Sequence, residues 1–252
     1  SKNLSFNFVC LVIIYYFNTP IKLKSNKQKS PMKTLFYTRE FPPYVYGGAG
    51  VHVEYLAAEL SKLMHVDVRC FGDQDSKEGN LTVKGFPYEN PIFNHSEDKL
   101  KAIFKALSTG LHMNADPIDA DIVHCHTWYS HFAGIMAKLC YGIPLVITTH
   151  SLEPLRPWKR EQLGRGYDAS SWIEKTAIEM ADALIAVSEE TKEDVLKHFN
   201  VDESKVKVIY NGINLEEYVT TTEASTLDTY NIDKTKPYVL FVGRITRQKG
   251  II

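Results

Sequence analysis

The sequence has few cysteines, almost no net charge and no long apolar segment, and each of these shortages excludes a class of protein. Its four cysteines are scattered without a Cys-x-x-Cys pair, which argues against a disulfide framework and favours free thiols in the cytoplasm. The net charge of −1 provides no basic face for nucleic acid. The longest predominantly apolar run, residues 6–17, has 12 residues, whereas a membrane-spanning helix needs about 20. We therefore expect a cytoplasmic globular protein that binds neither nucleic acid nor a membrane.

Residues 1–31 differ in composition from the rest of the chain. They contain five lysines and no acidic residue, a charge of +5, so the remaining 221 residues carry −6. Lys2 precedes the apolar run, as in a signal peptide, but Asn18-Thr19-Pro20 lacks the small-x-small pattern of a cleavage site. Met32 directly precedes the first expected strand. We interpret residues 1–31 as an extraneous tail, with a targeting signal as the alternative.

From Met32 onward, strand-like and helix-like segments alternate. Apolar residues recur with a helical period over residues 53–64, 100–111 and 172–180. Ser188, followed by two glutamates, predicts the start of a further helix. This alternation predicts an α/β fold with a Rossmann-like, doubly wound parallel sheet over residues 32–212. The expected strands are residues 35–38, 66–71, 81–86, 121–125, 145–149, 183–187 and 205–210.

The sequence changes character after this domain. Residues 213–236 are polar and irregular, which predicts a linker. Residues 238–244 form a new apolar run, which predicts another buried strand.

A glycine-rich loop, with Gly47, Gly48 and Gly50, lies between the first expected strand and the first helix. Glycines let the backbone approach a ligand closely, and a helix N-terminus favours a phosphate. The alternative is a flexible connector. A dinucleotide-binding fingerprint fits less well, because residues 39–46 separate the glycines from the strand.

Residues 124–131 read H-C-H-T-W-Y-S-H at the end of an expected strand. His124 and His126 share one side of the extended chain, so a zinc site would need ligands from elsewhere, and we expect no metal. For His124 and Trp128 a structural role, as a hydrogen-bonded imidazole beside a packed ring, is the favoured interpretation.

Residues 149–160, T-H-S-L-E-P-L-R-P-W-K-R, follow another apolar strand. Ligands of open α/β sheets bind outside the carboxyl ends of the strands. A histidine, a tryptophan and three basic residues at such a position predict a sugar and phosphate site.

The segment T-H-S-L-E-P-L-R-P-W-K, together with E-F-P-P before the glycines, resembles the retaining glucosyltransferases of the glycogen synthase type, in glycosyltransferase families 4 and 5. Thr127 stands between His126 and Trp128, where better-known bacterial glycogen synthases have aspartate, which points to the actinobacterial branch. The resemblance covers about 220 residues. It implies that residues 32–212 are the acceptor-side N-terminal domain of a GT-B fold and that residues 237–252 begin a truncated donor-binding Rossmann-like domain.

The resemblance also implies roles for single residues. His150 would be the catalytic histidine that hydrogen-bonds the transferred glucose, and Gly47 and Gly48 would contact the donor phosphates. Arg244 and Lys249, in G-R-I-T-R-Q-K-G, match the pair that grips the same diphosphate. The acceptor cleft would be lined by His126, Trp128, Arg156 and Trp158.

The implied activity is transfer of glucose from ADP-glucose or UDP-glucose to an α-1,4-glucan, with retention of configuration and without a metal, another cofactor or an enzymic nucleophile. Two alternatives stay open. A synthase that makes maltose 1-phosphate from glucose 1-phosphate is not separated by these motifs, and a non-catalytic carbohydrate-binding module is the alternative of another class. Because the donor-binding domain would be incomplete, we expect the isolated chain to be inactive.

Overall fold

The computed structural model describes residues 31–217 and 225–243. The chain divides into two compact units, Ser1–Gly212 and Ile213–Ile252. The second unit contains the short helix α8 (Ser225–Thr229). The first unit contains the sheet and the candidate site.

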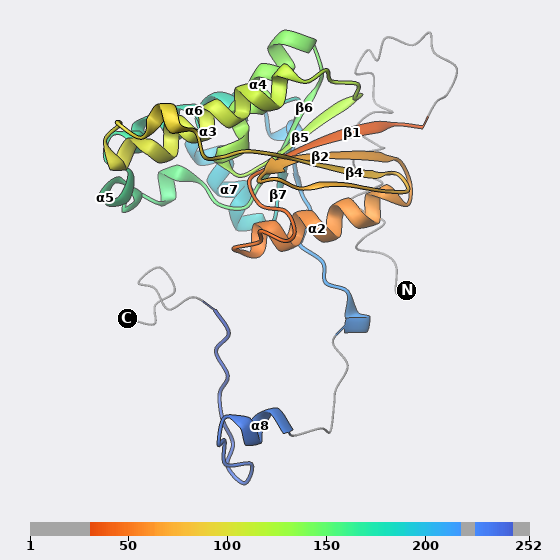
Figure 1. The fold of residues 1–252 in the computed structure, drawn as a ribbon, viewed down its shortest axis with the longest axis vertical. Helices are drawn as coiled ribbons and strands as arrows, with labels where there is room; N and C mark the ends of the chain where they lie inside the picture. The colour runs from red at the N-terminus through yellow and green to blue at the C-terminus, as the bar shows by residue number, and fades with distance from the viewer. Residues whose placement is uncertain (1–30, 218–224, 244–252) are drawn as a thin grey trace. The chain divides into compact units, whose positions relative to one another are not determined.

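The first unit is built on an eight-stranded sheet in the order β3-β4-β2-β1-β5-β6-β7-β8 (Figure 1). Strand β3 runs antiparallel to β4, and the other neighbouring strands are parallel. The predicted doubly wound α/β sheet is therefore confirmed. The strands are β1 (Lys33–Thr38), β2 (His65–Phe71), β3 (Asp75–Glu78), β4 (Leu81–Phe86), β5 (Ile122–His126), β6 (Leu145–Thr149), β7 (Ala183–Ala186) and β8 (Val206–Val208).

Helices cover both faces of the sheet, because successive side chains of a strand point to opposite sides. Along β1, Leu35 and Tyr37 enter the core beneath helices α3, α4 and α6, whereas Phe36 enters the core beneath α2. Figure 1 shows α2 on one side of the sheet and α3, α4 and α6 on the other. The helices are α2 (Gly48–Ser61), α3 (Asp98–Ala115), α4 (Trp128–Tyr141), α5 (Lys159–Leu163), α6 (Gly166–Met180) and α7 (Glu189–His198).

The chain changes direction across the sheet at β1. It first builds β2 and β4 on one side of β1, and then returns to place β5, β6, β7 and β8 on the other. The boundary between β1 and β5 is the topological switch point, where ligands bind in open α/β sheets. The register places Thr38, the last residue of β1, beside His126, the last residue of β5.

Most of the predicted elements are present within a residue or two. Ser188 caps α7 as expected, since its Oγ accepts a hydrogen bond from the backbone N of Thr191 at 3.1 Å. Of the described cysteines, Cys70, Cys125 and Cys140 are all free, as predicted. None of the helices within the described ranges has the length and apolarity needed to cross a membrane.

One predicted strand is wrong. Over residues 238–243, the described part of the apolar run, the backbone is irregular and Val239 is fully exposed. A strand forms only beside a partner that takes its backbone hydrogen bonds, and none of the eight described strands pairs with these residues.

Candidate functional site

The candidate site lies at the carboxyl ends of β1, β5 and β6, beside the switch point. Strand β1 leads through residues 39–47 into helix α2. Strand β5 ends at His126, and His150 follows β6 directly. These positions bring His126 and His150 together from segments 24 residues apart.

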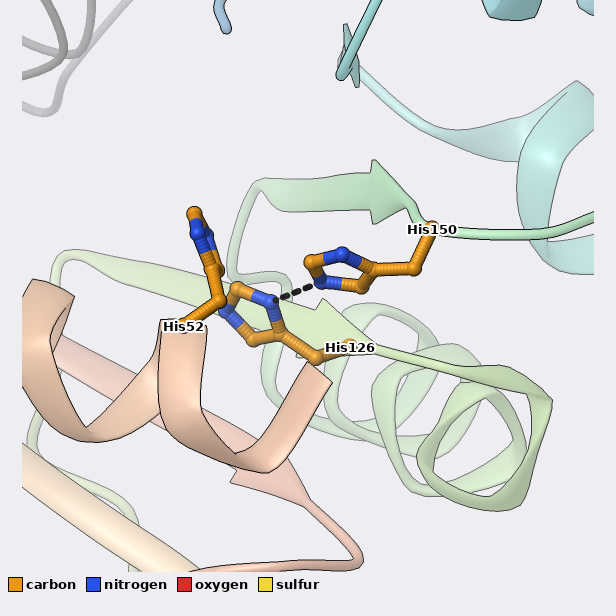
Figure 2. A group of neighbouring side chains, drawn as sticks. All are labelled: His52, His126 and His150. Carbon is orange, nitrogen blue, oxygen red and sulfur yellow. Dashed lines mark hydrogen bonds between the residues drawn. The ribbon is translucent and has the colours of Figure 1, made fainter. Parts of the chain in front are cut away.

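Three histidines form a cluster here (Figure 2). His126 Nδ1 and His150 Nε2 are 3.1 Å apart, a hydrogen bond in which one ring donates and the other accepts. His52, in helix α2, completes the group: its ring centroid is 4.9 Å from that of His150 and 5.7 Å from that of His126. His126 is fully buried, and the other two are partly buried.

The cluster is electrically neutral near pH 7. Burial lowers the pKa of His52 to about 4 and that of His150 to about 3. Burial, followed by the neighbouring imidazoles, holds the pKa of His126 well below its usual range. Neutral imidazoles can hydrogen-bond sugar hydroxyls, but they bring no charge to a phosphate.

The turn after His126 is strained. Thr127 has φ 67° and ψ 153°, a combination that residues other than glycine rarely adopt and that costs about 1–3 kcal/mol. Ser130 braces the turn, because its Oγ accepts from the His126 backbone N at 3.2 Å and donates to the His126 carbonyl at 2.9 Å. The fold thus fixes His126 tightly at the switch point.

His124 and Trp128, from the same segment, lie in the core. His124 is 1% exposed, and its Nε2 is 2.8 Å from Thr148 Oγ1, in line with the structural role favoured above. Trp128 is 3% exposed and stacks on Tyr129, with ring centroids 4.0 Å apart. The acceptor-binding role of Trp128 stays a prediction, and in this structure its ring is enclosed by protein.

The motif that follows β6 is anchored by a buried polar network. The Glu153 side chain is 1% exposed, and its carboxylate accepts hydrogen bonds from Lys159 Nζ at 2.6 Å and from Ser170 Oγ at 2.9 Å. Its backbone N donates to Glu174 Oε2 at 2.6 Å, and its carbonyl accepts from Tyr167 OH at 2.6 Å. This network fixes the segment just after His150 to helix α6.

The remaining cationic and aromatic residues of the motif differ in their surroundings. Arg156 Nη1 donates to Ser151 Oγ at 3.0 Å, next to His150 in sequence, whereas Arg160 pairs with Asp168 on the surface. Trp158 is 42% exposed. The cleft roles of Arg156 and Trp158 stay predictions.

The glycine loop forms the N-terminus of α2, as predicted. Gly47 caps the helix and Gly48 begins it. A side chain added at either position would meet nothing within 4 Å, so a ligand has room to approach. The backbone N atoms of Tyr46 and Gly47 donate to Glu40 Oε2 at 2.9 and 2.8 Å, which shows that this loop binds a carboxylate. The role of Gly47 and Gly48 with phosphate stays a prediction, and Arg244 and Lys249 lie outside the described residues.

A pocket of about 630 Å³ opens at the ends of β1, β2 and β4, within the size range of ligand pockets. It contains a cation, Arg39, whose guanidinium lies 4.1 Å from the centroid of the Tyr129 ring. The sequence did not indicate this pocket, because its residues come from three separate loops. Its lining residues are Arg39, Glu40, Tyr44, Val45, Tyr46, Phe71, Gly72, Asp73, Pro87, Tyr88 and Glu89.

Comparison with known proteins identifies the family. The profile of Glycosyltransferase Family 4 matches residues 46–217. The chain belongs to glycosyltransferase family 4. Within this family, it is 45% identical over 227 residues to the α-maltose-1-phosphate synthase of Mycolicibacterium smegmatis, which covers 87% of this chain and 55% of that protein. The chain thus spans about half the length of this curated relative.

The same comparison corrects the glycogen synthase prediction. The glycogen synthase of Mycobacterium tuberculosis is only 27% identical, over 243 residues that cover 87% of this chain and 56% of that enzyme. The T-H-S-L-E-P-L-R-P-W-K motif does not separate the two enzymes, and two of its residues, Glu153 and Lys159, form a buried ion pair with each other.

Solved structures support the fold. The sucrose-phosphate synthase of Thermosynechococcus elongatus superimposes with a TM-score of 0.67 at 19% identity, over 87% of this chain and 57% of that one. The likeness confirms the Rossmann-like sheet of a GT-B glycosyltransferase.

Proposed function

We propose that the whole protein transfers glucose from a nucleotide sugar, ADP-glucose or UDP-glucose, to glucose 1-phosphate and so makes maltose 1-phosphate. The observation that carries this proposal is the 45% identity to an α-maltose-1-phosphate synthase, against 27% to a glycogen synthase. Each of the two alignments covers 87% of the chain.

The site suits such a transfer without a metal or another cofactor. In the proposed reaction, the bond between the anomeric carbon and the donor diphosphate breaks. A bond to the O4 atom of the acceptor forms on the same face of the sugar, and the acceptor proton leaves with the nucleoside diphosphate. We propose that His150, held neutral by burial, hydrogen-bonds the transferred glucose.

Negative charge on the leaving diphosphate needs stabilisation, which fixed donors in a dry cleft provide. The N-terminus of α2 offers backbone N–H groups. The N–H groups of Tyr46 and Gly47 bind the Glu40 carboxylate, so a phosphate has to displace that carboxylate to reach the Gly47 N–H. We propose Gly47 and Gly48 as part of this phosphate contact, with Arg244 and Lys249 acting from the donor side.

The acceptor carries a phosphate of its own. Arg39 offers a guanidinium in the pocket beside the glycine loop, where the carboxylates of Glu40, Asp73 and Glu89 also lie. We propose Arg39 alone among these residues as a contact of the acceptor phosphate.

The whole protein should be incubated with each nucleotide sugar and glucose 1-phosphate, and the products separated by chromatography and mass spectrometry. We expect a hexose disaccharide phosphate that a phosphatase converts to maltose. His150→Ala should lower turnover at least about 100-fold, the usual scale for a group that acts in the transition state, with a smaller change in donor KM. His95→Ala, at an exposed histidine outside the cluster, is the control. Formation of no disaccharide phosphate would overturn the proposal.

A further inference from the structure

The three histidines of the cluster lie close enough together to bind one metal ion. One ring nitrogen each from His52, His126 and His150 lies within 4.8 Å of the others. In a tetrahedral zinc site with bonds of about 2.0–2.1 Å, neighbouring ligand nitrogens lie about 3.3 Å apart. The separation of 3.1 Å between His126 Nδ1 and His150 Nε2 is close to that value. To bind an ion, these two rings have to give up the proton of their hydrogen bond and rotate so that both nitrogens aim at the ion, and His52 has to move inward.

The cluster is held on rigid elements. His126 ends the central strand β5, His150 directly follows β6, and His52 lies near the start of α2. The His126 ring also packs against Phe36, with ring centroids 5.3 Å apart, and against His124, at 4.2 Å. A preorganised site of this kind requires little ordering of its ligands on binding.

The ligand type also suits zinc, because imidazole nitrogen is one of the groups that bind Zn²⁺ in proteins. Three protein ligands leave a fourth position open to solvent, as in zinc sites with three histidines.

We propose that His52, His126 and His150 together bind one Zn²⁺ ion, with a solvent molecule in the fourth position. The spacing within the sequence could not indicate this site, because its ligands come from one helix and from the ends of two strands. Since His150 is also the residue proposed to contact the transferred glucose, a bound ion would occupy the space of that sugar. This consequence rests on the proposed function, whereas zinc binding itself does not.

The test uses the 252-residue chain in a Cys10→Ser, Cys140→Ser background. These changes remove the exposed thiol of the described residues, Cys140, and the cysteine that lies outside them as competing ligands. Zn²⁺ is titrated by calorimetry, and Co²⁺ is used as a visible-absorption probe of tetrahedral coordination. We expect one ion per chain with a micromolar or lower Kd, and the absorption bands of tetrahedral cobalt.

His52→Ala should weaken binding at least about 10-fold, because two imidazoles hold zinc poorly. Circular dichroism would confirm that this variant is folded, and alanine suits its helical position. His95→Ala should bind zinc like the parent chain. Absence of a single stoichiometric site, cobalt spectra of octahedral form, or equal affinities of His52→Ala and the parent would each overturn the proposal. The transferase assay is separate, so a failure of either proposal can be told from a failure of the other.

Discussion

Replacing Lys159 by methionine tests whether the motif after β6 is an internal brace. Lys159 and Glu153 form an ion pair at 2.6 Å, and their side chains are only 9% and 1% exposed. Methionine keeps most of the aliphatic length of lysine but removes the ammonium group. The variant therefore leaves the Glu153 carboxylate buried, with Ser170 Oγ as its remaining close donor and Arg156 Nη1 3.9 Å away.

The expected cost is large because a buried charge loses its partner. Removing one member of a buried ion pair typically lowers the free energy of unfolding by about 3–5 kcal/mol. Arg160 is a matched control, since its pair with Asp168 is about half exposed, with side chains at 53% and 52%. Solvent screens that pair, so Arg160→Met should leave stability nearly unchanged.

Urea unfolding followed by tryptophan fluorescence measures the effect. The double variant Glu153→Gln, Lys159→Met removes both charges and keeps an acceptor for Ser170, so it should lose clearly less stability than Lys159→Met alone. Equal effects of Lys159→Met and Arg160→Met would refute the brace. A double variant as unstable as Lys159→Met would show that the buried charge is not the cause.

Two further predictions concern stability. Burial raises the pKa of Glu174 from 4.5 to about 8, so the folded state holds an extra proton between these values, and the free energy of unfolding should fall by up to about 1.4 kcal/mol per pH unit as pH rises through that window. Glu174→Gln should remove this slope in urea titrations at pH 5 to 9; an unchanged slope would rule out Glu174 as its source. Gly134→Ala would place a methyl group 2.4 Å from Cys125 Sγ and 2.8 Å from Leu145 Cδ1, and should cost about 1–3 kcal/mol by thermal or urea unfolding. Gly47→Ala meets no atom within 4 Å and should cost much less; equal losses would contradict the packing argument.

The parts of the fold that could be predicted from the sequence are those where burial leaves a clear pattern. Strands β5 and β6 are buried along their whole length and read as short apolar runs. Strand β3 was missed, because its four residues are all exposed and polar. Helix α4 was missed for the opposite reason. It contacts α3, α6 and the sheet, so its own apolar residues lie on several of its sides and show no clear helical period.

The candidate site could be predicted only in part. His126 and His150 stood out because each follows an apolar strand, and parallel strands bring their ends to one edge. His52 gave no such sign, since it lies within a helix and meets His126 only through the tertiary fold. Lys159 was counted among the three basic residues of the predicted sugar and phosphate site, because its burial against Glu153 depends on tertiary packing that the sequence does not reveal.

The central claim is that the protein uses glucose 1-phosphate as its acceptor, and a comparison of two acceptors tests it most directly. The whole protein should be given the same labelled nucleotide sugar with either glucose 1-phosphate or a maltooligosaccharide, and kcat/KM measured for each acceptor. We predict a kcat/KM at least about 10-fold higher for glucose 1-phosphate, equivalent to about 1.4 kcal/mol of transition-state binding. Efficient transfer to the maltooligosaccharide, with none to glucose 1-phosphate, would contradict the account.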